Sequence, residues 1–189
     1  MGKKVLLICD MLNDFIQPGA PLEVPGVRNI IPAIRREMEK ARREGVPIIY
    51  VCDCHVASDP ELSVWPPHAM KGTPGAEIIP ELKPREDDIV LEKTRYDAFY
   101  NTDLESILRS LGAADMILTG VCTEICIHYT GVGAIQRGFR VHVPEDCVHG
   151  LSEPESAAAL RMLKQVLQPA APAGSFPHPP KNPSRLGML

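Results

Sequence analysis

Three side chains that could carry out hydrolytic chemistry stand at the ends of apolar runs. Asp10 directly follows the run 5–9, Lys93 follows a shorter apolar run, and Cys126 comes shortly after a third. A cysteine near a helix N-terminus and beside a cation has a lowered thiol pKa. A carboxylate such as Asp10 can accept the thiol proton and return it to a leaving amine. Together the three residues predict acyl transfer through a cysteine nucleophile.

Taken singly, each of these residues has a more common structural role. A carboxylate after a strand is often a helix cap, a lysine is usually solvated, and a cysteine in an apolar helix is usually part of the core. The segment 120–126 adds weight to the catalytic interpretation. We expect its backbone N–H groups to surround the sulfur where an oxyanion would form.

A second group of residues has the composition of a metal site. Asp53 and His55 are two residues apart at the end of an apolar run, so both point to one side, and His68 lies in the long segment that follows. One carboxylate and two imidazoles with open coordination positions suit a divalent ion, zinc first, with iron or manganese as alternatives. A hydrogen-bonded Asp–His pair with a separate surface histidine fits the spacing equally well.

The elements that must position these residues alternate between strand and helix. Continuous apolar runs at 5–9, 46–51 and 116–121 are typical of strands covered on both faces. Helical periodicity occupies the segments between them, and the motifs Thr102-x-x-Glu105 and Ser152-x-x-Glu155 are expected capping boxes. We therefore predict an α/β fold: an open, mostly parallel sheet with helices on both faces in three layers, and its site beyond the carboxyl ends of the strands.

The chain divides into one domain and a tail. We expect the hydrolase domain to cover residues 1–167, including a long, proline- and glycine-rich connection at 55–83 that is more typical of a functional loop than of a simple link. Residues 168–189 contain repeated prolines and few large apolar side chains, which predicts a flexible tail.

Composition and charge narrow the class of partner. The 20 basic and 24 acidic residues give a net charge of −4, which is the wrong sign for tracking phosphate backbones, so we expect no nucleic-acid partner. The first apolar run is too short for a signal peptide or a membrane span. We expect a cytoplasmic protein, a homo-oligomer, with its six cysteines reduced and mostly buried.

The motifs around the three reactive residues resemble those of a known family. Cys-Asp10-Met-Leu-Asn-Asp-Phe15, Leu-Glu-Lys93-Thr-Arg-Tyr-Asp and Gly-Val-Cys-Thr-Glu-Ile-Cys126 are similar, in this order, to the isochorismatase-like cysteine hydrolases over residues 4–167. The resemblance implies that the aspartate, lysine and cysteine form a catalytic triad. It also implies a cis peptide between Val121 and Cys122 that aims the N–H groups of Cys122 and Cys126 at the oxyanion.

The long connection narrows the resemblance to one branch. Its segment Trp65-Pro-Pro-His68-Ala-Met-Lys-Gly-Thr-Pro-Gly is similar to nicotinamidases and pyrazinamidases, in which the residues matching Asp53, His55 and His68 hold a metal ion. The resemblance implies hydrolysis of a small amide such as nicotinamide to acid and ammonia, with Phe15 and Trp65 as pocket walls; Tyr96 follows Lys93 closely enough to flank the same pocket.

Other assignments remain open at the level of sequence. Leu12 stands where many nicotinamidases have glutamine, and the stretch between His55 and His68 is short for that branch. Related enzymes cleave isochorismate, ureidoacrylate, carbamoyl amines or biuret. A thiol-containing binding or redox-sensing protein is the alternative from outside the enzymes.

Overall fold

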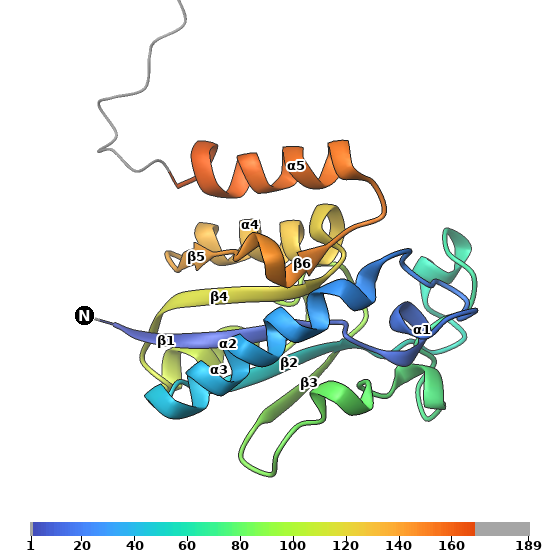
Figure 1. Ribbon diagram of the computed structural model, residues 1–189, viewed down its shortest axis with the longest axis horizontal. Helices are drawn as coiled ribbons and strands as arrows, with labels where there is room; N and C mark the ends of the chain where they lie inside the picture. The colour runs from blue at the N-terminus through green and yellow to red at the C-terminus, as the bar shows by residue number, and fades with distance from the viewer. Residues whose placement is uncertain (1, 169–189) are drawn as a thin grey trace, which may run out of the picture.

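The computed structural model describes residues 2–168 and consists of a parallel sheet between layers of helices (Figure 1). The strands are β1 (Lys3–Cys9), β2 (Ile48–Asp53), β3 (Ile89–Lys93), β4 (Ala113–Val121), β5 (Arg140–His142) and β6 (Val148–His149). Their order in the sheet is β3-β2-β1-β4-β5, all pairs are parallel, and β6 pairs with the end of β4. The predicted fold class is confirmed, and the short strand β6 is an addition that the sequence did not predict.

Two apolar cores lie on opposite faces of the sheet. Along β1, Leu6 and Ile8 face the core covered by α2 (Ile31–Glu44), while Leu7 and Cys9 face the other core. That second core is covered by α3 (Leu104–Ser110), α4 (His128–Gln136) and the segment after α5 (Glu153–Arg161). Burial on both faces explains why the central strands read as continuous apolar runs.

Helix α2 follows directly from its sequence. Its buried residues, Ile31, Ile34, Met38 and Ala41, recur at three- and four-residue spacing and form one apolar stripe. The helix ends at Gly45, which has a left-handed φ of 65° and donates its N–H to the last turn. In Figure 1, α2 crosses in front of the sheet, and it links β1 to β2 in the expected β-α-β order.

Several expected local boundaries are wrong. Lys93 is the last residue of β3 and does not follow it. The box at Thr102 does not form: α3 begins at Leu104, whose N–H is accepted by the Thr102 hydroxyl at 3.3 Å. Ser152 does precede α5 and its hydroxyl donates to Glu155, but its side chain does not cap the helix backbone. A π-helical turn replaces the last part of this helix, Met162–Val166.

The end of the described chain is attached to the sheet. The Gln168 amide nitrogen donates to the Val141 carbonyl at 2.9 Å, and its oxygen accepts from the Val141 N–H at 2.6 Å. The remainder of the expected tail, 169–189, lies outside the described residues. Within the described part, no helix has both the length and the apolar character needed to cross a membrane.

Candidate active site

The polar residues singled out in the sequence meet at one edge of the sheet because its strands are parallel. Cys9, the last residue of β1, pairs with Val51 of β2 and Gly120 of β4, and Asp53 at the end of β2 pairs with Lys93 at the end of β3. The register therefore places Asp10, Asp53 and Lys93 side by side at the carboxyl ends of the strands.

Lys93 is the centre of the cluster. Its side chain is fully buried, and its ammonium lies 2.9 Å from Asp10 Oδ2, 2.5 Å from Asp53 Oδ1 and 3.6 Å from the sulfur of Cys126. Burial lowers the pKa of Lys93, but the charges of Asp10 and Asp53 outweigh burial and raise it well above the ordinary value. A permanent ammonium therefore holds the two carboxylates and the thiol together.

Asp10 is fixed by its backbone as well as by its side chain. Its φ of 52° lies in the left-handed region that aspartate tolerates better than most residues, and its Oδ1 accepts the N–H of Asp53 at 2.8 Å. Burial, with the charge of Asp53 next, raises the pKa of Asp10 to about 6 despite the nearby Lys93. Asp10 is thus ionised at neutral pH and basic enough to accept a proton.

Cys126 lies in the turn that follows β4. This turn, Thr123–Ile127, is π-helical and leads into α4, and it brings the Cys126 sulfur within 4.8 Å of carboxylate oxygens of Asp10 and Asp53. Burial raises the pKa of Cys126 well above its ordinary value, and the opposing charge of Lys93 does not compensate. The expectation of a lowered thiol pKa is therefore wrong in this structure, because the sulfur is buried beside two carboxylates. The Cys126 sulfur therefore carries its proton at neutral pH, and it would need a base in order to act as a nucleophile.

The backbone before Cys126 is tightly packed. The peptide bond between Val121 and Cys122 is cis, and Gly120 has a φ of 108°. A Cβ on Gly120 would lie 2.0 Å from the Cys9 carbonyl oxygen, so only glycine allows β4 to run this close to β1. Cys122 is buried and lines the same cavity as Cys126.

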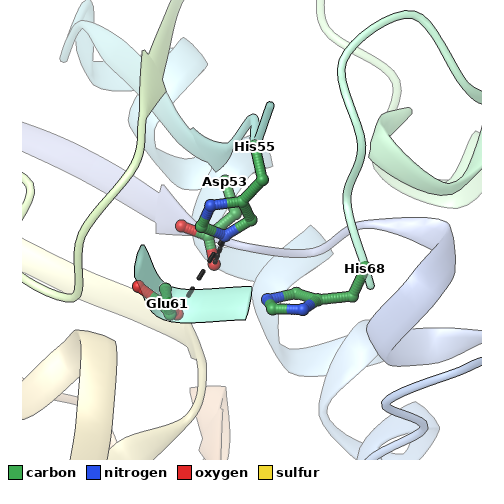
Figure 2. A group of neighbouring side chains, drawn as sticks. All are labelled: Asp53, His55, Glu61 and His68. Atoms are coloured by element: carbon green, nitrogen blue, oxygen red, sulfur yellow. Dashed lines mark ion pairs between the residues drawn. The ribbon is translucent and has the colours of Figure 1, made fainter. Parts of the chain in front are cut away.

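Next to this cluster is a second one, formed by Asp53, His55, Glu61 and His68 (Figure 2). One nitrogen or carboxylate oxygen from each residue lies within 4.8 Å of the others, and all four residues are buried. Sequence reasoning had named three of these residues and missed Glu61. The only local signal was its position in Asp59-Pro60-Glu61 inside the long connection, where a 3₁₀ turn brings the side chain back to His55.

The geometry of the second cluster fits a divalent cation. His68 Nδ1 lies 2.7 Å from the Pro66 carbonyl oxygen, which leaves Nε2 for the cluster, and the buried His55 Nε2 has no hydrogen-bond partner among the described residues. The same nitrogen lies 3.8 Å from Asp53 and 4.0 Å from Glu61. Burial, and secondly the negative charge of Asp53, raises the pKa of Glu61 to about 7. Two imidazoles and two carboxylates are a donor set typical of zinc.

Both clusters open into one cavity of about 240 Å³. Asp10, Asp53, Glu61, His68, Cys122 and Cys126 contribute to its lining, and apolar walls come from Phe15, Trp65, Tyr96, Leu22, Ile125 and Leu151. The Trp65 indole donates to the Tyr96 hydroxyl at 3.0 Å, and the rings of Phe15 and His68 are 5.5 Å apart. The cavity thus combines apolar and aromatic walls with the polar side chains of both clusters.

A parallel α/β sheet with a buried cysteine, lysine and aspartate at its carboxyl edge is the arrangement expected of a cysteine hydrolase. The chain matches the isochorismatase domain over residues 4–173 and belongs to the isochorismatase family.

Solved structures extend this assignment. The chain is similar to N-carbamoylsarcosine amidase from Thermoplasma acidophilum (37% identity, TM-score 0.80, covering 84% of this chain and 91% of that chain). It is also similar to nicotinamidase/pyrazinamidase PncA from Bacillus subtilis (31%, 0.83, 87% and 96%) and to the pyrazinamidase of Pyrococcus horikoshii in complex with zinc (31%, 0.80, 85% and 94%).

Proposed function

We propose that the protein is a cysteine amidohydrolase of the nicotinamidase type, which hydrolyses a small ring-bearing amide to the acid and ammonia. The observation that carries this proposal is the contact of one buried ammonium, that of Lys93, with both Asp10 and Cys126 beneath a cavity that also holds the second cluster. A binding protein would gain nothing from burying this ion pair beside a thiol.

Cys126 is the proposed nucleophile. As its sulfur attacks the amide carbon, Asp10 accepts the thiol proton, so that a C–S bond forms and the carbonyl oxygen becomes an oxyanion. The backbone N–H groups of Cys122 and Cys126 are the proposed donors to that oxyanion. Lys93 is the positioning charge: it keeps Asp10 ionised before the transfer and stays close to the sulfur during it.

Asp10 then acts as an acid and again as a base. It returns the proton to the nitrogen, the C–N bond breaks and ammonia leaves, which produces a thioester on Cys126. A water molecule gives a proton to Asp10 and attacks the thioester carbon; the acid is released and the sulfur recovers its proton. The pKa of Asp10, about 6, allows both directions of transfer at neutral pH.

The residues proposed to hold a divalent ion, zinc before iron or manganese, are Asp53, His55, Glu61 and His68. When bound, the ion would supply a Lewis acid that orients the substrate in the cavity. Asp53 connects the two clusters, because its Oδ1 contacts Lys93 while its Oδ2 faces His55.

The second candidate substrate is a carbamoyl amine. It is favoured by the similarity to N-carbamoylsarcosine amidase and by Leu12, which is buried and apolar where many nicotinamidases have an amide side chain. Ammonia release measured with nicotinamide, pyrazinamide, biuret and N-carbamoyl amines distinguishes the two. Turnover of carbamoyl amines alone would reject the nicotinamidase assignment and keep the cysteine mechanism.

The mechanism itself is tested with two matched cysteine variants. Cys126→Ala should reduce turnover to background, because it removes the nucleophile, while Cys122→Ala should keep most of the activity, because only its backbone is used. Both cysteines are buried, so unfolding curves of the two variants control for packing. Activity of Cys126→Ala close to that of the wild type would reject the mechanism.

A further inference from the structure

Asp59 is a buried carboxylate that the proposed chemistry does not use, and it contacts two members of the second cluster. Its Oδ2 lies 3.1 Å from His55 Nδ1, and its Oδ1 accepts the backbone N–H of Glu61 at 3.3 Å. The Asp59 side chain is 3% exposed. A carboxylate this deeply buried is costly unless its partners are fixed.

The contact with His55 determines which ring nitrogen is free. A carboxylate can only accept a hydrogen bond, so Nδ1 must carry a proton when it meets Asp59. The other nitrogen, Nε2, faces Asp53 and Glu61, the side from which a cation would be bound (Figure 2). Asp59 therefore selects the tautomer in which the Nε2 lone pair is available to a metal ion.

The contact with Glu61 positions a second donor. Asp59 precedes the 3₁₀ turn Pro60–Ser63, and its side chain caps the turn at the N–H of Glu61. The cap fixes the direction in which the Glu61 side chain leaves the backbone. One carboxylate thus positions two of the four donors without being one of the four.

Arg95, in the segment that follows β3, completes the arrangement. Its guanidinium donates to Asp59 Oδ1 at 2.5 Å, and its side chain is 34% exposed. Oδ1 thus receives two N–H donors, from Arg95 and Glu61, while Oδ2 is left for His55. The two carboxylate oxygens of Asp59 therefore have different hydrogen-bond partners.

We propose that Asp59, held by Arg95, is the positioning residue of the metal site: it sets the His55 tautomer and orients Glu61 for a divalent cation. This inference rests on the metal site in the proposed function. The same contacts predict that an asparagine side chain cannot replace Asp59 in this role. In Asp59→Asn, the side-chain oxygen must face the two donors, so the NH₂ group faces His55 Nδ1 and forces the ring proton onto Nε2.

The test is the dissociation constant for Zn²⁺, measured on chelator-stripped full-length protein by competition with a chromophoric chelator. Asp59→Asn should weaken zinc binding by about 10- to 100-fold. The matched control is Glu92→Gln, which also removes one negative charge; the Glu92 side chain is exposed and forms an ion pair with the exposed Lys71. It should bind zinc as the wild type does.

The outcomes separate this inference from the proposed function. Wild-type zinc affinity in a folded Asp59→Asn variant would overturn the role of Asp59 while leaving the metal site intact. Failure of the wild type to bind zinc would overturn the metal site and this inference together.

A second measurement does not depend on the variant folding. In zinc-loaded wild-type protein, the ¹⁵N shifts of His55 should report a protonated Nδ1 and a metal-bound Nε2. The opposite assignment would overturn the proposal.

Discussion

At Gly131 of α4, a single added methyl group should reveal how closely α4 packs against the segment that carries Leu163. A Cβ built on Gly131 would lie 2.7 Å from Cδ2 and 3.0 Å from Cδ1 of Leu163, which is fully buried. Carbon atoms normally rest about 3.5–4.0 Å apart, so the leucine would have to move by about 1 Å.

Two opposing effects determine how much Gly131→Ala changes the free energy of unfolding. Overpacking a well-packed core costs about 1–3 kcal/mol, and replacing glycine by alanine inside a helix gains about 1 kcal/mol. We expect the free energy of unfolding to fall by up to about 2 kcal/mol. In a Leu163→Ala background the obstruction is gone, so the same substitution should stabilise the protein by about 1 kcal/mol.

Urea unfolding of the four proteins in this double-mutant cycle gives the answer. Leu163→Ala alone should cost about 2–5 kcal/mol, which sets the reference for the second background. A change of sign between the backgrounds is the expected result. If Gly131→Ala stabilised the wild-type protein, or had the same effect in both backgrounds, the packing argument would be refuted.

Three further predictions concern charge, the chain end and the metal. Side-chain hydrogen bonds from Arg140 lower the pKa of Asp115 from 3.8 to about 2, so the ionised Asp115 stabilises the fold above pH 4 and this contribution disappears as the pH falls toward 2. Because Arg140 is exposed, Asp115→Asn should lower the free energy of unfolding by only about 1–2 kcal/mol at pH 7. Urea unfolding should show this difference vanish near pH 2. Removal of 169–189 should leave the rate of ammonia release and the free energy of unfolding unchanged. Removal of Gln168 as well should lower the free energy of unfolding by about 1–2 kcal/mol, because three hydrogen bonds of its side chain are lost. His68→Ala should lower the zinc content found by elemental analysis and raise KM more than it lowers kcat; an unchanged zinc content would contradict its role as a ligand.

The sequence by itself determined the order of elements and the edge of the sheet where the site lies. Apolar runs covered on both faces and helices between them leave a parallel sheet as the consistent arrangement, and parallel strands bring their carboxyl ends together. Asp10, Asp53 and Lys93 could therefore be placed at one edge from their positions after apolar runs. Cys126 could be placed near them from its distance after the run 116–121.

Only the tertiary structure decided distances, burial and the partners supplied by irregular segments. Glu61 and Asp59 lie in a connection without periodicity, and although Asp59-Pro60 is a local signal for the start of a turn, it does not indicate that this turn packs against His55. The pKa of Cys126 was wrongly expected to be low because a helix start and a lysine are visible in sequence, whereas complete burial is not. Burial depends on every element packed around the sulfur, and electrostatic effects in such a site follow from that packing rather than from local residue types.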